Sequence, residues 1–221
     1  MITLGLCSVN EYLSLALATP DGCLAEYTIK RAKIDDLLCI LEMLLQETGL
    51  KTENIEKYVV VNGPGSYAGI RIGLSLIKTL ALVNNRPVVT VNLLELMAYE
   101  HKLYPGLIVV AVDSRKDEVN FGMYGGHPFN TLIDYSTINK ELLFSKLSKI
   151  EGDYILLGNL KEIPKALEEK FYYSLPSAYK AILLAKTKTP EELVDILPIY
   201  SYPVNISGKA EKHQPKTKNK C

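Results

Sequence analysis

The segment from Gly63 to Gly73 comes closest, by residue type and spacing, to a chemical site. It reads Gly-Pro-Gly-Ser-Tyr-Ala-Gly-Ile-Arg-Ile-Gly, between an expected strand at 58–61 and an expected helix from Ala68 to about Val83. Glycines permit a sharp turn at such a junction, and the free N–H groups of a helix start can hold an anion. Anion binding is therefore the first chemistry to consider here.

Three interpretations of this segment compete. Gly63, Gly65 and Ala68 fit the dinucleotide pattern G-x-G-x-x-A, but the next expected strand ends at 91–92 without the required acid. A P-loop needs Gly-Lys followed by Ser or Thr, and the sequence has no such triplet. In the third interpretation Gly69 and Gly73, four residues apart on one helix face, let another backbone approach closely.

A second cluster of charged residues follows the apolar run 107–112. It consists of Asp113, Arg115 and Glu118, which could form a site at a lobe junction or near a nucleotide. The alternative, which we favour, is a structural pair between Arg115 and Glu118. Asp117 and Glu118 are adjacent and point to opposite faces of a strand, so they cannot act as a carboxylate pair.

Histidine and cysteine usage gives no metal site. His101, His127 and His213 lie too far apart to form an i, i+4 pair on one helix. The four cysteines form no C-x-x-C pair, and Cys7, Cys23 and Cys39 lie in apolar runs. We expect these three to act as small hydrophobic residues with reduced thiols, as in a cytosolic protein. The sequence shows no Ser-His-Asp or Cys-His motif context.

Composition indicates a globular protein without a dominant surface charge. The chain has 221 residues, 48% of them hydrophobic and 23% charged, and a net charge of zero. Such a balance excludes a whole-surface field for nucleic acid or membrane. No uncharged apolar run approaches the roughly 20 residues that span a bilayer, and no basic stretch of a signal peptide opens the chain. We therefore predict a cytoplasmic protein without membrane contact.

The order of elements predicts an α/β fold of two lobes. Apolar runs at 2–7, 12–18 and 23–29 predict a three-stranded meander with a turn at 20–22, and a helix follows at 34–48. A fully apolar run at 107–112 predicts a central strand of a second half. We predict an N-terminal lobe at 1–103, a C-terminal lobe at 104–204 and a basic, disordered tail at 205–221.

The two long helices of the first half are apolar around most of their circumference. A helix with one buried face needs an apolar stripe of only about 100°, and both helices exceed it. A chain of this size has too few elements to cover both, so we expect a partner protein to do so. The expected interface comprises Leu38, Leu41, Leu45, Gly65, Tyr67, Gly69, Arg71, Gly73, Leu76 and Ile77.

The glycine string of residues 63–74 resembles the signature of the TsaB (YeaZ) family. Supporting pieces are the 112–119 stretch, with Asp113, Arg115 and Glu118, and Pro198-Ile199-Tyr200, so the resemblance spans about residues 1–203. It implies a two-lobed fold of the actin/hexokinase/Hsp70 (ASKHA) type. The chain departs from the family at Cys7, where an Asp is usual, at Lys33 and at Ser201-Tyr202.

The resemblance also implies a function. Family members are non-catalytic subunits that pair through the N-lobe helices with a catalytic paralogue, TsaD, and work with the ATPase TsaE. The complex adds threonylcarbamoyl to adenosine 37 of tRNAs reading ANN codons. We therefore expect no cofactor here, with ATP and metal on the partner subunits, and tRNA contact that is indirect or made through the lysine tail. The alternatives are a small-molecule kinase or acyltransferase of the same fold, and a homodimeric scaffold.

Overall fold

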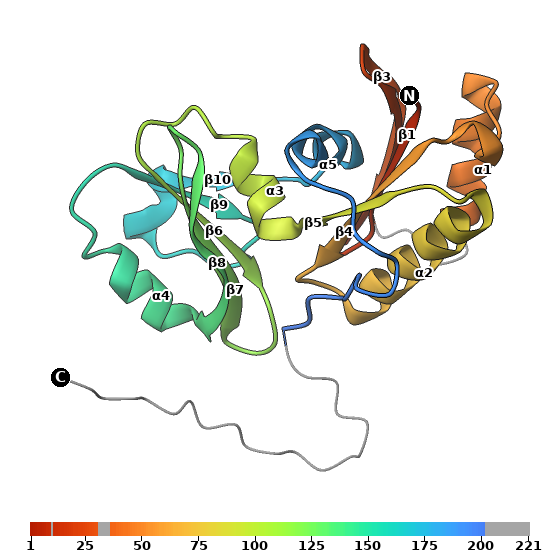
Figure 1. Cartoon of the computed structure of the whole chain (residues 1–221). Coiled ribbons are helices and arrows are strands. Elements are labelled where there is room, and N and C mark those ends of the chain that lie inside the picture. The colour runs from red at the N-terminus through yellow and green to blue at the C-terminus, as the bar shows by residue number, and fades with distance from the viewer. Residues whose placement is uncertain (10, 31–35, 202–221) are drawn as a thin grey trace.

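The first lobe is built on a mixed sheet. The computed structural model describes residues 1–9, 11–30 and 36–201, and within them this sheet has the order β3-β2-β1-β4-β5 (Figure 1). Its strands are β1 (Thr3–Cys7), β2 (Tyr12–Thr19), β3 (Gly22–Lys30), β4 (Lys57–Gly63) and β5 (Val88–Asn92). The first three pair antiparallel, as the predicted meander requires, and β4 and β5 continue the sheet parallel to β1.

The second lobe has its own mixed sheet, in the order β10-β9-β6-β7-β8. Its strands are β6 (Leu107–Asp113), β7 (Glu118–Gly125), β8 (Asn130–Asn139), β9 (Tyr154–Gly158) and β10 (Phe171–Tyr173). The apolar run 107–112 forms the central strand, as predicted, and its residues from Ile108 to Val112 are buried. The predicted two-lobed α/β architecture is confirmed.

Helices cover both faces of the first sheet. The helices are α1 (Asp36–Thr48), α2 (Tyr67–Asn84), α3 (Leu93–Tyr99), α4 (Lys140–Leu147) and α5 (Ala178–Leu184), with 3₁₀ turns η1 (Thr52–Asn54), η2 (Lys165–Lys170) and η3 (Ala185–Thr187). α1 and α2 pack on one face of the first sheet and α5 packs on the other (Figure 1). The first residues of the predicted 34–48 helix, and the lysine tail, lie outside the described residues.

The position of α5 corrects the predicted lobe boundary. This helix belongs to the 104–204 segment, but it packs on β1, β2 and β4 of the first lobe. Ala178 and Ala181 are fully buried there, and a side chain at Gly5 would come within 2.6 Å of the Ala178 carbonyl oxygen. The chain therefore returns to the first lobe after completing the second sheet, because small residues on both sides allow close packing.

A carboxylate on β3 anchors the start of α5. Glu26 Oε1 accepts hydrogen bonds from Ser177 Oγ (2.7 Å), Tyr179 N (3.1 Å) and Ser14 Oγ (2.8 Å). Ser14 Oγ in turn accepts one from Ala178 N at 3.0 Å. Because a negative charge at a helix start also interacts favourably with the helix dipole, Glu26 fixes the returning segment to the first sheet.

We expect Glu26→Ala to destabilise the protein by about 2 kcal/mol. The change removes the acceptor of three hydrogen bonds, and bonds to charged groups contribute about 1.5–3 kcal/mol, reduced here because Glu26 is exposed. Urea unfolding measures the change against Glu169→Ala, an exposed glutamate on η2. Equal midpoints for the two variants would show that the Glu26 carboxylate does not hold α5.

The three cysteines expected to act as small hydrophobic residues are all free thiols, but they lie in two environments. Cys7, at the end of β1, is 1% exposed, whereas Cys23 and Cys39 are exposed. Cys23 lies on edge strand β3 and Cys39 on the outer side of α1. An apolar neighbourhood in the sequence does not bury these two, because β3 and α1 stand at the margin of the lobe.

Candidate functional site

A cleft of about 820 Å³ opens where the two lobes meet. The first lobe contributes the loop after β1, the Pro64–Tyr67 turn before α2, and Leu93. The second contributes the loops after β6, β9 and β10. Since β1 runs parallel to β4 and β6 parallel to β9, the cleft lies at carboxyl ends of parallel strands in both sheets, the usual place for a ligand in α/β proteins.

The predicted charged cluster is only partly brought to this cleft. Asp113 and Arg115 line it, whereas Glu118 is not part of the lining. Glu118 instead closes the β6–β7 turn through its backbone, with its N–H donating to the Arg115 carbonyl (3.1 Å) and its carbonyl accepting from Ser114 N (2.9 Å). The three residues therefore belong to one tight turn and do not converge on a common point.

Asp113 is engaged by the protein itself. Its Oδ1 lies 2.9 Å from Nζ of Lys140 at the start of α4, and its Oδ2 accepts a hydrogen bond of 3.1 Å from Lys161 N. Both side chains of the ion pair are largely buried, with 22% and 18% of their areas exposed. These contacts join β6 to α4 and to the loop after β9, which supports a structural role for Asp113.

The surroundings of Cys7, which the resemblance matches to a position usually held by aspartate, do not suit a cation. Burial raises the pKa of the Cys7 thiol to about 12, so the sulfur stays protonated at neutral pH. A neutral thiol is a poor ligand for a hard cation such as Mg²⁺. Within residues 1–9, 11–30 and 36–201, no three His, Cys, Asp or Glu side chains group in a way that could hold a metal ion.

The glycine-rich turn packs against its own chain. Ser66 caps α2 by accepting a hydrogen bond from Gly69 N at 3.3 Å, and its own N–H donates to the Val9 carbonyl. A Cβ at Gly65 would overlap the Val9 carbonyl oxygen, and one at Gly69 would overlap that of Ser8. These glycines therefore let α2 approach the loop after β1 within the chain.

Gly73 completes the same contact. A Cβ at Gly73 would overlap Ser8 Oγ, which itself donates a hydrogen bond of 2.9 Å to the Gly69 carbonyl. The predicted close approach of a backbone to this glycine face is thus real, but the backbone is the chain's own, from the loop 61 residues earlier. The side of Gly69 and Gly73 on which a Cβ would stand is accordingly occupied by Ser8 of this chain.

The predicted interface residues divide by burial. Leu41, Gly73 and Ile77 are buried inside the lobe, so the prediction that they form a surface is wrong. Each faces the sheet, which needs one apolar side of each helix. Leu38, Tyr67 and Arg71 are exposed, and the remaining four are half-buried: Leu45, Gly65, Gly69 and Leu76.

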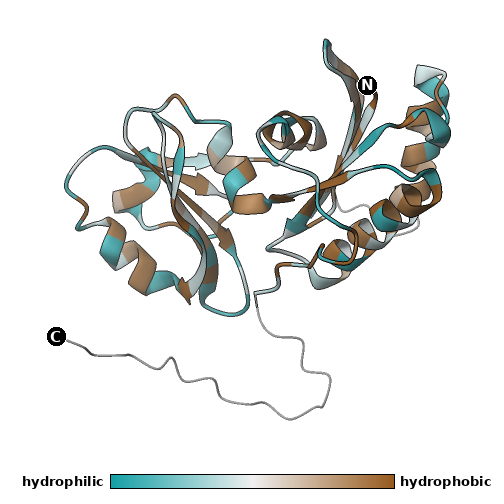
Figure 2. Ribbon diagram, viewed as in Figure 1, coloured by the Kyte–Doolittle hydropathy of each residue, from teal (hydrophilic) through white to brown (hydrophobic). Residues whose placement is uncertain are grey.

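An apolar groove runs along the outside of the first lobe. It has a volume of about 430 Å³, with four leucines in its lining and a polar rim. The leucines are Leu38, Leu41, Leu45 and Leu50, and the polar residues are Glu42, Gln46, Lys51, Thr52 and Glu53. Figure 2 shows brown, hydrophobic segments along α1 and α2 on this outer side. Sequence reasoning missed three further exposed apolar residues on these helices: Met43, Leu82 and Val83, which are 51%, 71% and 76% exposed. Their position on the helical wheel, away from the buried stripe, was the available signal.

The segment Ile196–Ser201, which we call the C-terminal strap, crosses from one lobe to the other. Ser201 Oγ accepts a hydrogen bond of 2.8 Å from Asn120 Nδ2, and Asn120 on β7 is only 1% exposed. Asn120 Oδ1 accepts from Thr137 Oγ1 at 3.0 Å. The departure from the family at Ser201 therefore has a local reason, because a serine hydroxyl pairs with a buried amide.

The opposite rim of the cleft is also bridged. Tyr173 is the last residue of β10, and its hydroxyl donates a hydrogen bond of 3.3 Å to Glu11 Oε1. This bond joins the second lobe to the loop before β2. Burial, helped by the nearby Tyr12 hydroxyl and the Glu11 carboxylate, raises the pKa of Tyr173 to about 12. The phenol therefore remains a hydrogen-bond donor at neutral pH, and the two lobes are tied on both sides of the cleft.

The two sheets, the cleft between them and the outer helices define a two-lobed α/β protein of the ASKHA type, as the sequence predicted. YeaZ from Pseudomonas aeruginosa has the same fold, with a TM-score of 0.73 at 22% identity over 90% of this chain and 99% of that chain. A sequence model described as "TsaD: tRNA N6-adenosine threonylcarbamoyltransferase" matches residues 24–188. The chain belongs to that family.

Within the family the chain resembles TsaB. It is 34% identical over 126 residues to the Bacillus subtilis protein named tRNA threonylcarbamoyladenosine biosynthesis protein TsaB, covering 56% of this chain and 55% of that protein. The TsaB protein of Buchnera aphidicola is 26% identical over 75% of this chain and 79% of its own length. A tRNA N6-adenosine threonylcarbamoyltransferase of Methylobacterium nodulans is 35% identical over 47% of this chain. The chain thus aligns with about half of the B. subtilis protein and 30% of the transferase. The expected resemblance to TsaB (YeaZ) is confirmed.

Among the helices within residues 1–9, 11–30 and 36–201, none is long and apolar enough to cross a bilayer.

Proposed function

We propose that this chain serves threonylcarbamoyladenosine (t6A) biosynthesis as a non-catalytic subunit that binds and supports the catalytic paralogue TsaD. The names of its TsaB relatives support the pathway. The complex would modify adenosine 37 of tRNAs reading ANN codons in the cytoplasm, with TsaE as the ATPase. ATP and metal would be held by the partner subunits, and tRNA would be contacted indirectly or through the lysine tail.

The observation that carries the partner role is the uncovered apolar surface of α1 and α2. Leu38 projects beside the groove with 62% of its area exposed, and Val83 at the end of α2 is 76% exposed. Exposed apolar residues scattered singly are ordinary, but a groove with four leucines in its lining, in a lobe whose α2 exposes further apolar residues, is typical of a protein interface. This surface replaces the glycine face as the proposed contact with TsaD.

The non-catalytic part of the proposal rests on the cleft. The Cys7 thiol is neutral and buried, and Asp113 is paired with Lys140. An enzyme of this fold needs a carboxylate free to hold the metal of a nucleotide, and both candidate positions are otherwise occupied.

A second candidate function is a small-molecule kinase or acyltransferase, which the 820 Å³ cleft favours. A third is a homodimeric scaffold that uses the same groove against itself. The two alternatives make different predictions. An enzyme would bind ATP without TsaD, and a scaffold would remain a homodimer when TsaD is added.

The experiment is size-exclusion chromatography with light scattering, on this chain alone and mixed with TsaD of the same organism. We expect a stable complex, with t6A formation on tRNA restored only when TsaD and TsaE are also present. Absence of a complex, together with tight ATP binding or activity by this chain alone, would refute the subunit role. A homodimer that TsaD does not displace would favour the scaffold.

A further inference from the structure

The C-terminal strap is held to the first lobe by backbone and side-chain hydrogen bonds. Lys78 Nζ donates to the Ile196 carbonyl (2.9 Å), and Asn62 Nδ2 donates to the Leu197 carbonyl (3.0 Å). The Ile199 N–H returns a bond of 2.8 Å to the Asn62 carbonyl. These bonds hold the strap beside α2 and the end of β4, from Lys78 toward the start of the helix.

The second lobe holds the other end of the strap. Tyr135 OH donates to the Tyr200 carbonyl at 3.3 Å, and Asn120 binds Ser201 as described above. Tyr200 is thus fixed by its backbone from one lobe while its side chain reaches the other.

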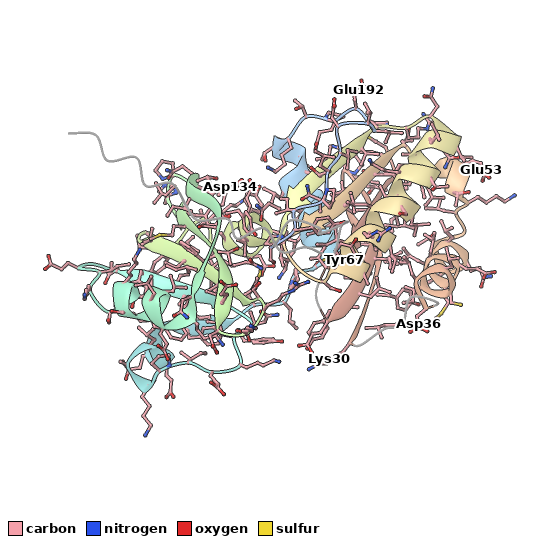
Figure 3. All side chains as sticks on the ribbon, turned by 90° about the horizontal axis from the view of Figure 1, so that it is seen from below. Lys30, Asp36, Glu53, Tyr67, Asp134 and Glu192 are labelled. Atoms are coloured by element: carbon pink, nitrogen blue, oxygen red, sulfur yellow. The ribbon has the colours of Figure 1, made fainter. Side chains whose placement is uncertain are left out.

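That side chain contacts the beginning of α2. The Tyr200 ring lies against the Tyr67 ring, with centroids 4.9 Å apart and planes inclined by 38°. On its other side Tyr67 meets Arg71, whose guanidinium lies 5.3 Å from the ring centroid and donates through Nη1 to the Tyr67 hydroxyl at 3.0 Å. Figure 3 places Tyr67 at the junction of the two lobes.

Tyr67 depends on Tyr200 for its orientation. It is the first residue of α2 and 41% exposed, and its two side-chain contacts described above are with Tyr200 and with Arg71, which is itself exposed. Aromatic pairs at this distance stabilise one arrangement by about 0.5–1.5 kcal/mol beyond the buried area. Removing the Tyr200 ring would release both side chains into several rotamers.

We propose that Tyr200 is a positioning residue for partner binding: by stacking on Tyr67 it holds the Tyr67–Arg71 pair in the orientation that the partner contacts. This inference rests on the proposed function, and it takes the exposed Tyr67 and Arg71 of the predicted interface as part of the contact with TsaD, in addition to the α1 groove. Aromatic and arginine side chains contribute strongly to interfaces, and fixing them before binding reduces the entropy lost on association. The strap thereby links the second lobe to an interface formed by the first.

The test compares Tyr200→Ala, Tyr200→Phe and the matched control Leu197→Ala in the full chain, by titration calorimetry with TsaD of the same organism. Leu197 belongs to the strap and is 67% exposed, and its carbonyl contact with Asn62 survives the change. We expect Tyr200→Ala to raise Kd about tenfold and the other two variants to stay within twofold of the unsubstituted chain. Phenylalanine restores binding because the stack needs the ring and not the hydroxyl.

A double-mutant cycle separates positioning from direct contact. If Tyr200 acts through Tyr67, Tyr200→Ala adds no further loss to Tyr67→Ala. Hydrogen exchange on the free chain gives a second measurement. The Gly69 and Ile70 amides, which donate to Ser66 Oγ and to the Ser66 carbonyl, should exchange faster in Tyr200→Ala and not in Leu197→Ala.

The outcomes distinguish this inference from the proposed function. If the unsubstituted chain does not bind TsaD, both are overturned. If it binds and Tyr200→Ala binds equally well, or the two alanine variants give additive losses, the positioning role alone is overturned.

Discussion

Replacing Leu38 with aspartate should weaken the complex with TsaD at least 100-fold and leave this chain folded. Leu38 lines the groove on α1 and is 62% exposed, so the free chain loses little by the change. In the complex the new carboxylate would be buried against apolar groups without a partner, which costs several kcal/mol. A 100-fold rise in Kd corresponds to about 2.7 kcal/mol. Titration calorimetry measures it, with circular dichroism and thermal unfolding as the check on folding.

The matched control is Leu132→Asp on β8. Leu132 is 57% exposed, so the two changes are chemically alike and similar in exposure, but Leu132 lies in the second lobe. We expect it to bind TsaD with unchanged affinity. Normal binding by Leu38→Asp would remove the α1 groove from the interface, and an equal loss in both variants would point to a contact that extends over the second lobe.

The elements that depend on local sequence could be predicted. The meander needs only alternating runs and the turn at 20–22, and the Ser66 cap needs only a serine before a helix. The apolar run 107–112 could only be a buried strand, because it has no polar face to expose. The order of these elements then predicted two lobes, and the family resemblance implied the ASKHA type.

The contacts that the sequence could not predict are all distant in the chain. Ser8 meets Gly69 across 61 residues, Asn120 meets Ser201 across 81, and Glu26 meets Ser177 across 151. Periodicity within one helix shows that a face is apolar or small but not which segment covers it. For this reason the glycine face of α2 was assigned to a partner, although the loop after β1 already occupies it.

The α1 groove shows again that helix periodicity does not determine which residues are covered. Leu38 and Leu41 are three residues apart on α1, and both were predicted to be at the interface. α1 packs on β2 and β3, and Leu41 is 5% exposed there whereas Leu38 is 62% exposed. Which of two neighbouring leucines the sheet covers is a property of the assembled lobe.

Gly69→Ala should destabilise the protein by about 2–3 kcal/mol. We expect any loss of partner binding in this variant to result from unfolding of the first lobe. In a helix interior this change alone would stabilise by about 1 kcal/mol. Here the added Cβ overlaps the backbone carbonyl oxygen of Ser8, which cannot move without displacing β1. Overpacking of this kind costs about 1–3 kcal/mol and sometimes more.

Gly73→Ala provides the comparison, because its new Cβ meets a side-chain oxygen. The overlapping atom is Ser8 Oγ, and the next contacts, Leu6 Cδ2 at 3.4 Å and Ser8 Cβ at 3.6 Å, are ordinary. Adding Ser8→Ala should therefore recover most of the stability lost in Gly73→Ala and none of that lost in Gly69→Ala. Urea unfolding of Gly69→Ala and Gly73→Ala, each with and without Ser8→Ala, measures this, together with TsaD binding at a temperature where each variant is folded.

A Gly69→Ala chain that is as stable as the unsubstituted one and still fails to bind TsaD would show that this glycine face meets the partner after all. The same result for Gly73→Ala would extend that contact along α2. Rescue of Gly73→Ala alone would establish that the loop after β1 determines how close α2 lies to the sheet, and hence the shape of the surface that α2 presents.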